Sequence, residues 1–151
     1  MPIRPENRSR YPDDWNAISA RVREEAGQRC EWCSVENGAT ILRGSDNQDG
    51  ASLPAYRYAD ASAHDHSFHA QTGEPIPGAD WDTFDPNARG PVKVILTVAH
   101  LDHQPENCAR DNLRALCQAC HNAYDAPMRA RGIAERKRAK RAISDLFPKP
   151  N

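Results

Sequence analysis

The chain has 151 residues, of which 38% are hydrophobic and 27% charged, and a formal net charge of −1. This length fits one domain, and so polar a composition predicts a small core that depends on cross-links for stability. No apolar run approaches the roughly 20 residues that a membrane-spanning helix needs, and residues 1–12 lack the apolar segment of a secretory signal. The composition therefore argues against a membrane protein and predicts a soluble protein of the cytoplasm.

The first predicted element is an amphipathic lead-in helix over residues 13–26. Asp13 or Asp14 is a suitable N-cap, and Gly27 is a typical helix stop. Apolar residues recur through the segment at three- and four-residue spacing: Trp15, Ile18, Val22 and Ala26. This spacing places them on one face of a helix, which we expect to pack against the rest of the domain.

Four of the five cysteines form two Cys-x-x-Cys pairs, Cys30 with Cys33 and Cys117 with Cys120. In a cytoplasmic protein such pairs indicate zinc rather than a disulfide, because two intervening residues let both sulfurs reach one ion. The pairs lie far apart in the sequence, so the fold must bring them together. Two unrelated pairs, or a redox-active pair, are the alternatives. Cys108 has no assigned role.

The central segment, residues 34–90, is the least readable. It holds several glycine-containing turn signals and few strand signals, so we predict an irregular insertion. Within it, His64, His66 and His69 are spaced in a pattern that can bind a metal. The alternative is an ordinary polar loop, since histidines are also common there.

A β-hairpin followed by a helix is predicted over residues 92–126. Residues 94–98 form an apolar run typical of a buried strand. A polar loop follows, and residues 112–116 indicate a short returning strand. The second cysteine pair then forms a knuckle, with His121 early in a helix that we expect to end before Pro127.

A second, basic helix is predicted over residues 128–147. Between residues 129 and 141 a single acidic residue, Glu135, faces seven basic ones: Arg129, Arg131, Arg136, Lys137, Arg138, Lys140 and Arg141. A charge run of this density suits a nucleic-acid phosphate backbone. A solvated surface helix is the alternative.

The arrangement resembles the HNH endonucleases. The residues that carry the resemblance are His100, then Asn112 with Leu113, then the run Leu116-Cys117-x-x-Cys120-His121. The resemblance implies an α+β fold with a small ββα-metal (His-Me finger) core, built from the hairpin and the helix that follows it. It implies one nuclease domain, in which the four paired cysteines hold a structural Zn²⁺ and the two outer helices flank the core.

The resemblance also implies roles for individual residues. His100 would be the general base that activates water, Asn112 would orient its imidazole, and His121 would help to hold a catalytic divalent metal. Hard nitrogen and oxygen ligands suit Mg²⁺ or Mn²⁺, with Ni²⁺ or Zn²⁺ as substitutes in vitro.

One position departs from the family pattern. Many members carry a metal-binding Asp, Glu or His directly before the base, where this chain has Ala99. A second register is open, in which Asp102 is the metal ligand and His103 the base. In the first register, Asp102 and His103 lie in the loop and complete the metal shell.

The expected function is therefore metal-dependent hydrolysis of phosphodiester bonds in duplex DNA, with the basic helix on the DNA backbone. Two alternatives stay open. One is a zinc-stabilised DNA-binding protein that has lost catalysis, for which Ala99 argues. The other is a zinc module for protein partners, against which the presence of His100, Asn112 and His121 argues.

Overall fold

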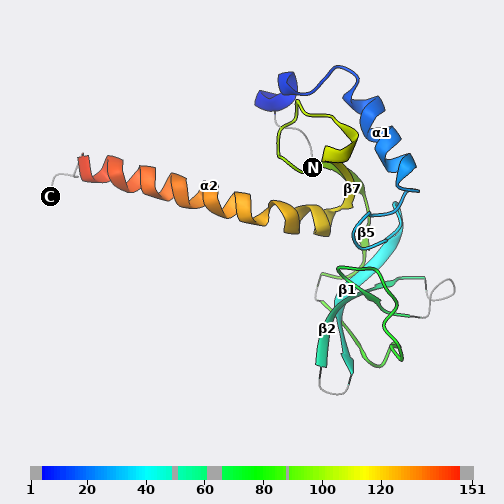
Figure 1. Cartoon of the computed structure of the whole chain (residues 1–151). Coiled ribbons are helices and arrows are strands. Elements are labelled where there is room, and N and C mark those ends of the chain that lie inside the picture. Colours follow the sequence, from blue (N-terminus) through cyan, green and yellow to red (C-terminus); the bar gives the residue numbers. More distant parts are fainter. Residues whose placement is uncertain (1–4, 49–50, 61–65, 88, 147–151) are drawn as a thin grey trace.

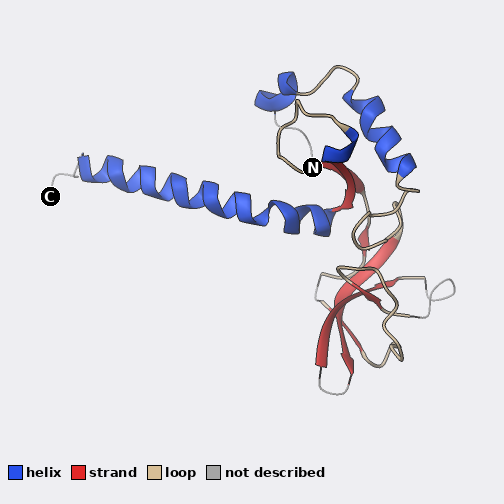
Figure 2. Cartoon of the chain, in the orientation of Figure 1, coloured by secondary structure: helices blue, strands red, loops and turns tan. Residues whose placement is uncertain are grey.

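The computed structural model describes residues 5–48, 51–60, 66–87 and 89–146, and it has a mixed α+β fold (Figures 1 and 2). Two α-helices and two antiparallel sheets make up most of it. The elements in chain order are η1 (Pro5–Arg10), α1 (Trp15–Glu25), β1 (Thr40–Gln48), β2 (Ala51–Tyr58), β3 (Phe68–His69), β4 (Phe84–Pro86), β5 (Val92–Lys93), β6 (Leu96–His100), η2 (Arg110–Asn112), β7 (Leu113–Cys117) and α2 (Gln118–Leu146).

Helix α1 packs on the hairpin of β6 and β7. It lies within the segment predicted to be helical, and its Val22 is buried in the core while Trp15 and Ile18 pack against the core's edge. After the helix, Gly27 and Gln28 both have a positive φ, at 63° and 55°. These left-handed residues turn the chain sharply toward the first cysteine pair.

The prediction of an irregular insertion over residues 34–90 is wrong for most of that segment. Strands β1 and β2 form a long antiparallel hairpin in a five-stranded sheet of order β3-β2-β1-β4, with β5 also paired to β1. Inside this hairpin Gly44 pairs with Ala55, and Pro54 pairs with Ser45. Glycine and proline usually mark turns instead. Gly44 is needed because a Cβ there would collide with the Asp85 carbonyl of β4.

The second sheet is the predicted hairpin, and its first strand begins two residues later than predicted. Strand β6 pairs with β7 in a register that sets Leu96 opposite Cys117 and His100 opposite Leu113. Val94 lies outside β6. Its N–H donates to the carbonyl of Ala39 at 2.7 Å, directly before β1, so Val94 is bound to the inserted sheet. Helix α2 follows β7 without a loop.

The predicted break at Pro127 is also wrong, because α2 is one continuous helix of 29 residues with Pro127 inside it. Pro127 removes the hydrogen bond to the carbonyl of Ala123, one turn earlier. Both residues are exposed, so water can satisfy that carbonyl and the helix continues. Beyond its first turns α2 leaves the body of the protein (Figure 1).

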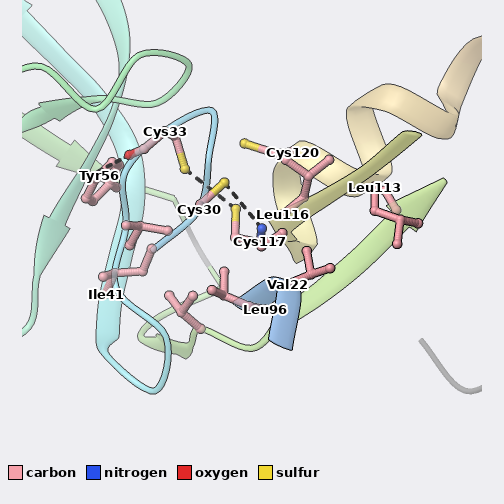
Figure 3. Packing of buried hydrophobic residues seen from close by; sticks show 14 of the residues in the cluster. Val22, Cys30, Cys33, Ile41, Tyr56, Leu96, Leu113, Leu116, Cys117 and Cys120 are labelled. Atoms are coloured by element: carbon pink, nitrogen blue, oxygen red, sulfur yellow. Dashed lines mark hydrogen bonds between the residues drawn. The ribbon is translucent and has the colours of Figure 1, made fainter. Parts of the chain in front are cut away.

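The main core lies where α1, β1, β2 and the β6–β7 hairpin meet (Figure 3). Val22, Ile41, Leu113 and Leu116 are each no more than 1% exposed there, and the paired cysteines belong to the same cluster. A smaller cluster around Phe84 and Ile76 lies under the other face of the five-stranded sheet. Within the described ranges, no helix is long and apolar enough to cross a bilayer.

Candidate metal centre and histidine groove

The fold brings the two distant cysteine pairs together. The ligand atoms of Cys30, Cys33, Cys117 and Cys120 all lie within 4.8 Å of one another, and all four side chains are buried. Cys30 and Cys33 come from the turn after α1, Cys117 ends β7, and Cys120 lies in the first turn of α2 (Figure 3). The two predicted pairs therefore form one site.

The spacing of the sulfurs fits a tetrahedral metal rather than disulfides. Cys33 Sγ and Cys117 Sγ are 3.7 Å apart. A tetrahedral Zn²⁺ with four sulfurs requires about 3.8 Å between them, whereas a disulfide requires about 2.05 Å. Hydrogen bonds from the thiols of Cys120, Cys30 and Cys33 also lower the pKa of Cys117, which favours a thiolate there. Four buried cysteines at this spacing indicate a zinc site.

The inserted sheet supports this centre from one side. Arg43 on β1 donates from Nη2 to Cys117 Sγ at 3.5 Å, and Tyr56 on β2 donates from its hydroxyl to the Cys33 carbonyl at 3.0 Å. The Cys117 N–H points at Cys30 Sγ at 3.4 Å. Hydrogen bonds of this kind stabilise thiolates and hold ligands in orientation.

A groove of about 650 Å³ opens beside the metal centre, between α1, β6 and the start of α2. Three histidines line it, namely His100, His103 and His121, together with Asp125. The arginines that line it are Arg10, Arg23 and Arg129. The groove therefore combines titratable side chains with positive charge.

His100 ends β6 and is held by aromatic rings. Its imidazole stacks on Trp15 with centroids 4.8 Å apart and meets Tyr11 edge-on at 5.8 Å. Its Nε2 lies 3.7 Å from Cys108 Sγ, the thiol with no predicted role. The side chain is only 8% exposed, and this burial lowers the pKa of His100 below its usual value. The ring is therefore neutral near pH 7 and able to accept a proton.

Asn112 does not orient His100 as predicted. Its Oδ1 accepts the Asp102 N–H at 3.0 Å, and its Nδ2 donates to Asp102 Oδ1 at 2.9 Å and to the Asn107 carbonyl at 2.8 Å. The Asn112 carbonyl also accepts the Leu101 N–H. Both polar atoms of the Asn112 side chain are thus hydrogen-bonded within the loop after β6, instead of to the imidazole of His100.

Asp102 likewise works inside the loop. Its carboxylate accepts hydrogen bonds from the Gln104 N–H at 2.8 Å and from Asn107 Nδ2 at 2.7 Å. Those bonds, together with the one from Asn112, lower the pKa of Asp102 to about 2. Asp102 is not among the residues that line the groove. Its predicted role as a metal ligand therefore has no geometric support.

The carboxylate next to His121 in the groove is that of Asp125, one turn further along α2. Asp125 Oδ2 is 3.6 Å from His121 Nε2, and Asp125 Oδ1 is 3.6 Å from His103 Nδ1. The other ring nitrogen of His121, Nδ1, lies 2.7 Å from Thr97 Oγ1 on β6, which fixes the ring. His121-x-x-x-Asp125 spacing on a helix was the signal that the sequence analysis missed.

The loop is fastened to α2 on this side. The Tyr124 hydroxyl donates to the Leu101 carbonyl, and its ring stacks on His103 at 4.9 Å. His103 has a positive φ of 58°, so the backbone turns there. Among the residues that the structure describes, the four thiols are the one group of three or more Cys, His, Asp or Glu whose ligand atoms all lie within 4.8 Å. His121, Asp125 and His103 therefore form an open arrangement.

The predicted basic residues separate into two groups. Arg129 lines the groove, where it donates to Asn122 Oδ1 at 3.2 Å and lies 3.9 Å from Asp125 Oδ2. The other six are exposed on the outer part of α2: Arg131, Arg136, Lys137, Arg138, Lys140 and Arg141. In the histidine cluster of the insertion, His66 is exposed and His69 lies on β3, while His64 falls outside the described residues.

Comparison with known proteins gave no match, whether against family models, curated proteins or solved structures.

Proposed function

We propose that this chain is a metal-dependent endonuclease of the HNH type that hydrolyses phosphodiester bonds in DNA. The observation that carries the proposal is that His100, from β6, and the His121–Asp125 pair, from α2, line one groove. Each residue alone has an ordinary structural explanation. A buried neutral imidazole, a histidine–carboxylate pair and arginines around one opening together match what phosphodiester hydrolysis needs.

The general base in this proposal is His100. Hydrolysis forms a bond from phosphorus to a water oxygen and breaks the bond to the 3′ oxygen, so the water must lose a proton. A general base works best when its pKa lies near the working pH, because it is then largely unprotonated and still able to take up a proton. The lowered pKa of His100 keeps its ring unprotonated, and stacking on Trp15 holds the ring in one orientation.

The proposed ligands of a catalytic divalent ion are His121 and Asp125. Their facing atoms lie 3.6 Å apart, so one imidazole nitrogen and one carboxylate oxygen would hold the ion. Such an ion would stabilise the charge on the phosphate and on the leaving oxygen. Asp125 takes the place that the sequence analysis gave to Asp102, and Mg²⁺ or Mn²⁺ is the expected metal, with Ni²⁺ as a substitute.

The substrate assignment rests on charge. The whole chain has a net charge of −1, yet Arg10, Arg23 and Arg129 line the groove and the basic part of α2 extends from it. Arg10 also pairs with Glu106 at 2.6 Å, which fastens η1 to the loop. A polyanion such as duplex DNA is attracted to a local concentration of cations even when the net charge is near zero.

A second candidate is a zinc-stabilised DNA-binding protein without catalysis. Ala99, where the family has a metal ligand, and the open arrangement of His121, Asp125 and His103 favour it. Both candidates predict DNA binding, so cleavage with added metal separates them.

The test is nicking of supercoiled plasmid by the purified protein in EDTA, Mg²⁺, Mn²⁺ or Ni²⁺. His100→Ala and His103→Ala are run beside it, with His69→Ala as a control on β3, away from the groove. We expect metal-dependent nicking that is lost in His100→Ala and retained in His69→Ala. Loss confined to His103→Ala would move the base to His103. Binding without nicking under every metal would favour the second candidate.

A further inference from the structure

The outer part of α2, residues 129–142, is called the arm below. It carries seven basic residues and one acidic residue, Glu135. All of its residues are exposed except the half-buried Gly132, and Figure 1 shows the helix extending away from the rest of the chain. Among the described residues, no ion pair or side-chain hydrogen bond joins the arm beyond Arg129 to the body.

A helix of this length and charge gains little stability by itself. Helices of about 12 to 15 residues are marginal in water without packing. Like charges one turn apart weaken the arm further, as in Arg136 with Lys140 and Lys137 with Arg141. A binding partner that neutralises these charges would stabilise the helix.

The basic residues surround most of the arm. At 3.6 residues per turn they span roughly 220° of its circumference. The remaining face holds small residues and the one carboxylate: Gly132, Glu135, Ala139 and Ala142. A helix lying along one strand of phosphates needs cations on a narrower face. Cations on both flanks suit a helix that has phosphates on both sides.

We propose that the arm lies in the major groove of duplex DNA, with its basic residues toward the two phosphate backbones and the Glu135 face toward solvent. A helix with its side chains is about 10 to 12 Å wide, and the major groove is about 12 Å wide. This inference rests on the proposed function, because it takes DNA as the polyanion in the histidine groove.

Continuity with the histidine groove supports the same occupant. Met128 and Arg129 line that groove, and Arg129 is the first residue of the arm. From Arg129 to Arg141 the helix extends about 18 Å at 1.5 Å per residue. The arm therefore contacts roughly five further base pairs on one side of the phosphate held in the groove.

Two matched substitutions test the orientation. Ala130 lies in the middle of the basic face and Ala139 on the opposite side of the helix, and both are exposed. Ala130→Glu and Ala139→Glu change the charge by the same amount and use the same good helix former. Binding to a fluorescent duplex of about 20 base pairs, long enough for groove and arm, is measured by anisotropy in EDTA at several salt concentrations.

We expect Ala130→Glu to weaken binding about tenfold and to reduce the salt slope by about one. Ala139→Glu is expected to keep the wild-type affinity and slope. The helical circular dichroism signal of wild type should persist to a higher temperature when duplex is added, because neutralised charges stabilise the arm. Equal zinc content in the three proteins shows that the substitutions leave the core folded.

Equal effects of the two substitutions, or no effect of either, would overturn the proposed orientation. Plasmid nicking that persists in that case leaves the nuclease proposal standing. The wild-type protein is also tested for binding to anionic phospholipid vesicles. Vesicle binding that Ala130→Glu weakens, together with no binding to duplex, would overturn DNA as the partner of the arm. Failure of wild type both to bind and to nick DNA would overturn the proposed function as well.

Discussion

Nε2 of His121 lies 3.6 Å from Oδ2 of Asp125, one helical turn later, while Nδ1 of His121 lies 2.7 Å from the Thr97 hydroxyl. The imidazole is therefore held from both sides, by a strand and by its own helix. Histidine ligands in metal sites commonly have their second nitrogen fixed in this way. This arrangement requires α2 to be a regular helix from His121 to Asp125.

Asp125→Asn tests whether this pair binds the catalytic metal. Loss of the charged oxygen should weaken Mg²⁺ or Mn²⁺ binding by roughly 10- to 100-fold. We expect the metal concentration needed for half-maximal nicking to rise by that factor. Asp102→Asn is the matched control, because Asp102 hydrogen bonds only within the loop in the contacts described above. Identical metal titrations for Asp125→Asn and wild type would contradict the assignment.

The zinc cysteines and the hairpin were predictable because their signals are local. A Cys-x-x-Cys spacing and an apolar run are each contained within a few consecutive residues. The five-stranded sheet was not predicted, because glycine and proline at positions 44 and 54 are typical of turns. Gly44 instead lies in a strand that pairs with its neighbour β2 and with the distant β4. Asp125, by contrast, was predictable, because it follows His121 by one helical turn and both residues precede Pro127 in the sequence.

The role of Asn112 could not be predicted for a related reason. The resemblance to HNH endonucleases implied a contact of Asn112 with the imidazole of His100 across the hairpin. The loop between them closes on itself instead, through Asp102 and Asn107, and His103 adopts a positive φ there. Which acceptor an amide reaches depends on such backbone turns, and a spacing in the sequence does not specify them.

The pH dependence of nicking should report His100. Burial lowers its pKa below the usual 6.5, and only the neutral ring accepts a proton. Activity should therefore rise with pH, with a midpoint below 6.5, and be constant above it. Trp15→Ala exposes the ring and should move the midpoint up toward 6.5. Rates measured from pH 5 to 8 at saturating metal check both expectations.

Asn112→Ala is the control for this pH profile. It should reduce the rate by loosening the loop, and leave the midpoint where it is, because Asn112 contacts Asp102 and Asn107 instead of the imidazole. A midpoint shift as large as that of Trp15→Ala would instead support the predicted contact between Asn112 and the imidazole of His100. Stability follows the same sign: the unfolded chain binds a proton at His100 more readily, so stability falls as the pH drops below 6.5.

Arg43 offers a test of the zinc centre that needs no nuclease activity. Four thiolates around Zn²⁺ leave a net charge of about −2, and the guanidinium of Arg43 lies 3.5 Å from Cys117 Sγ. Arg43→Met keeps an unbranched aliphatic side chain and removes the charge, so zinc should transfer to a chromogenic chelator roughly tenfold faster. Arg21→Met, on the exposed face of α1, is the matched control and should match wild type. If both variants release zinc at the wild-type rate, Arg43 packs beside the centre without stabilising it. Complete removal of zinc should unfold the core, because Cys30, Cys33, Cys117 and Cys120 are buried within it.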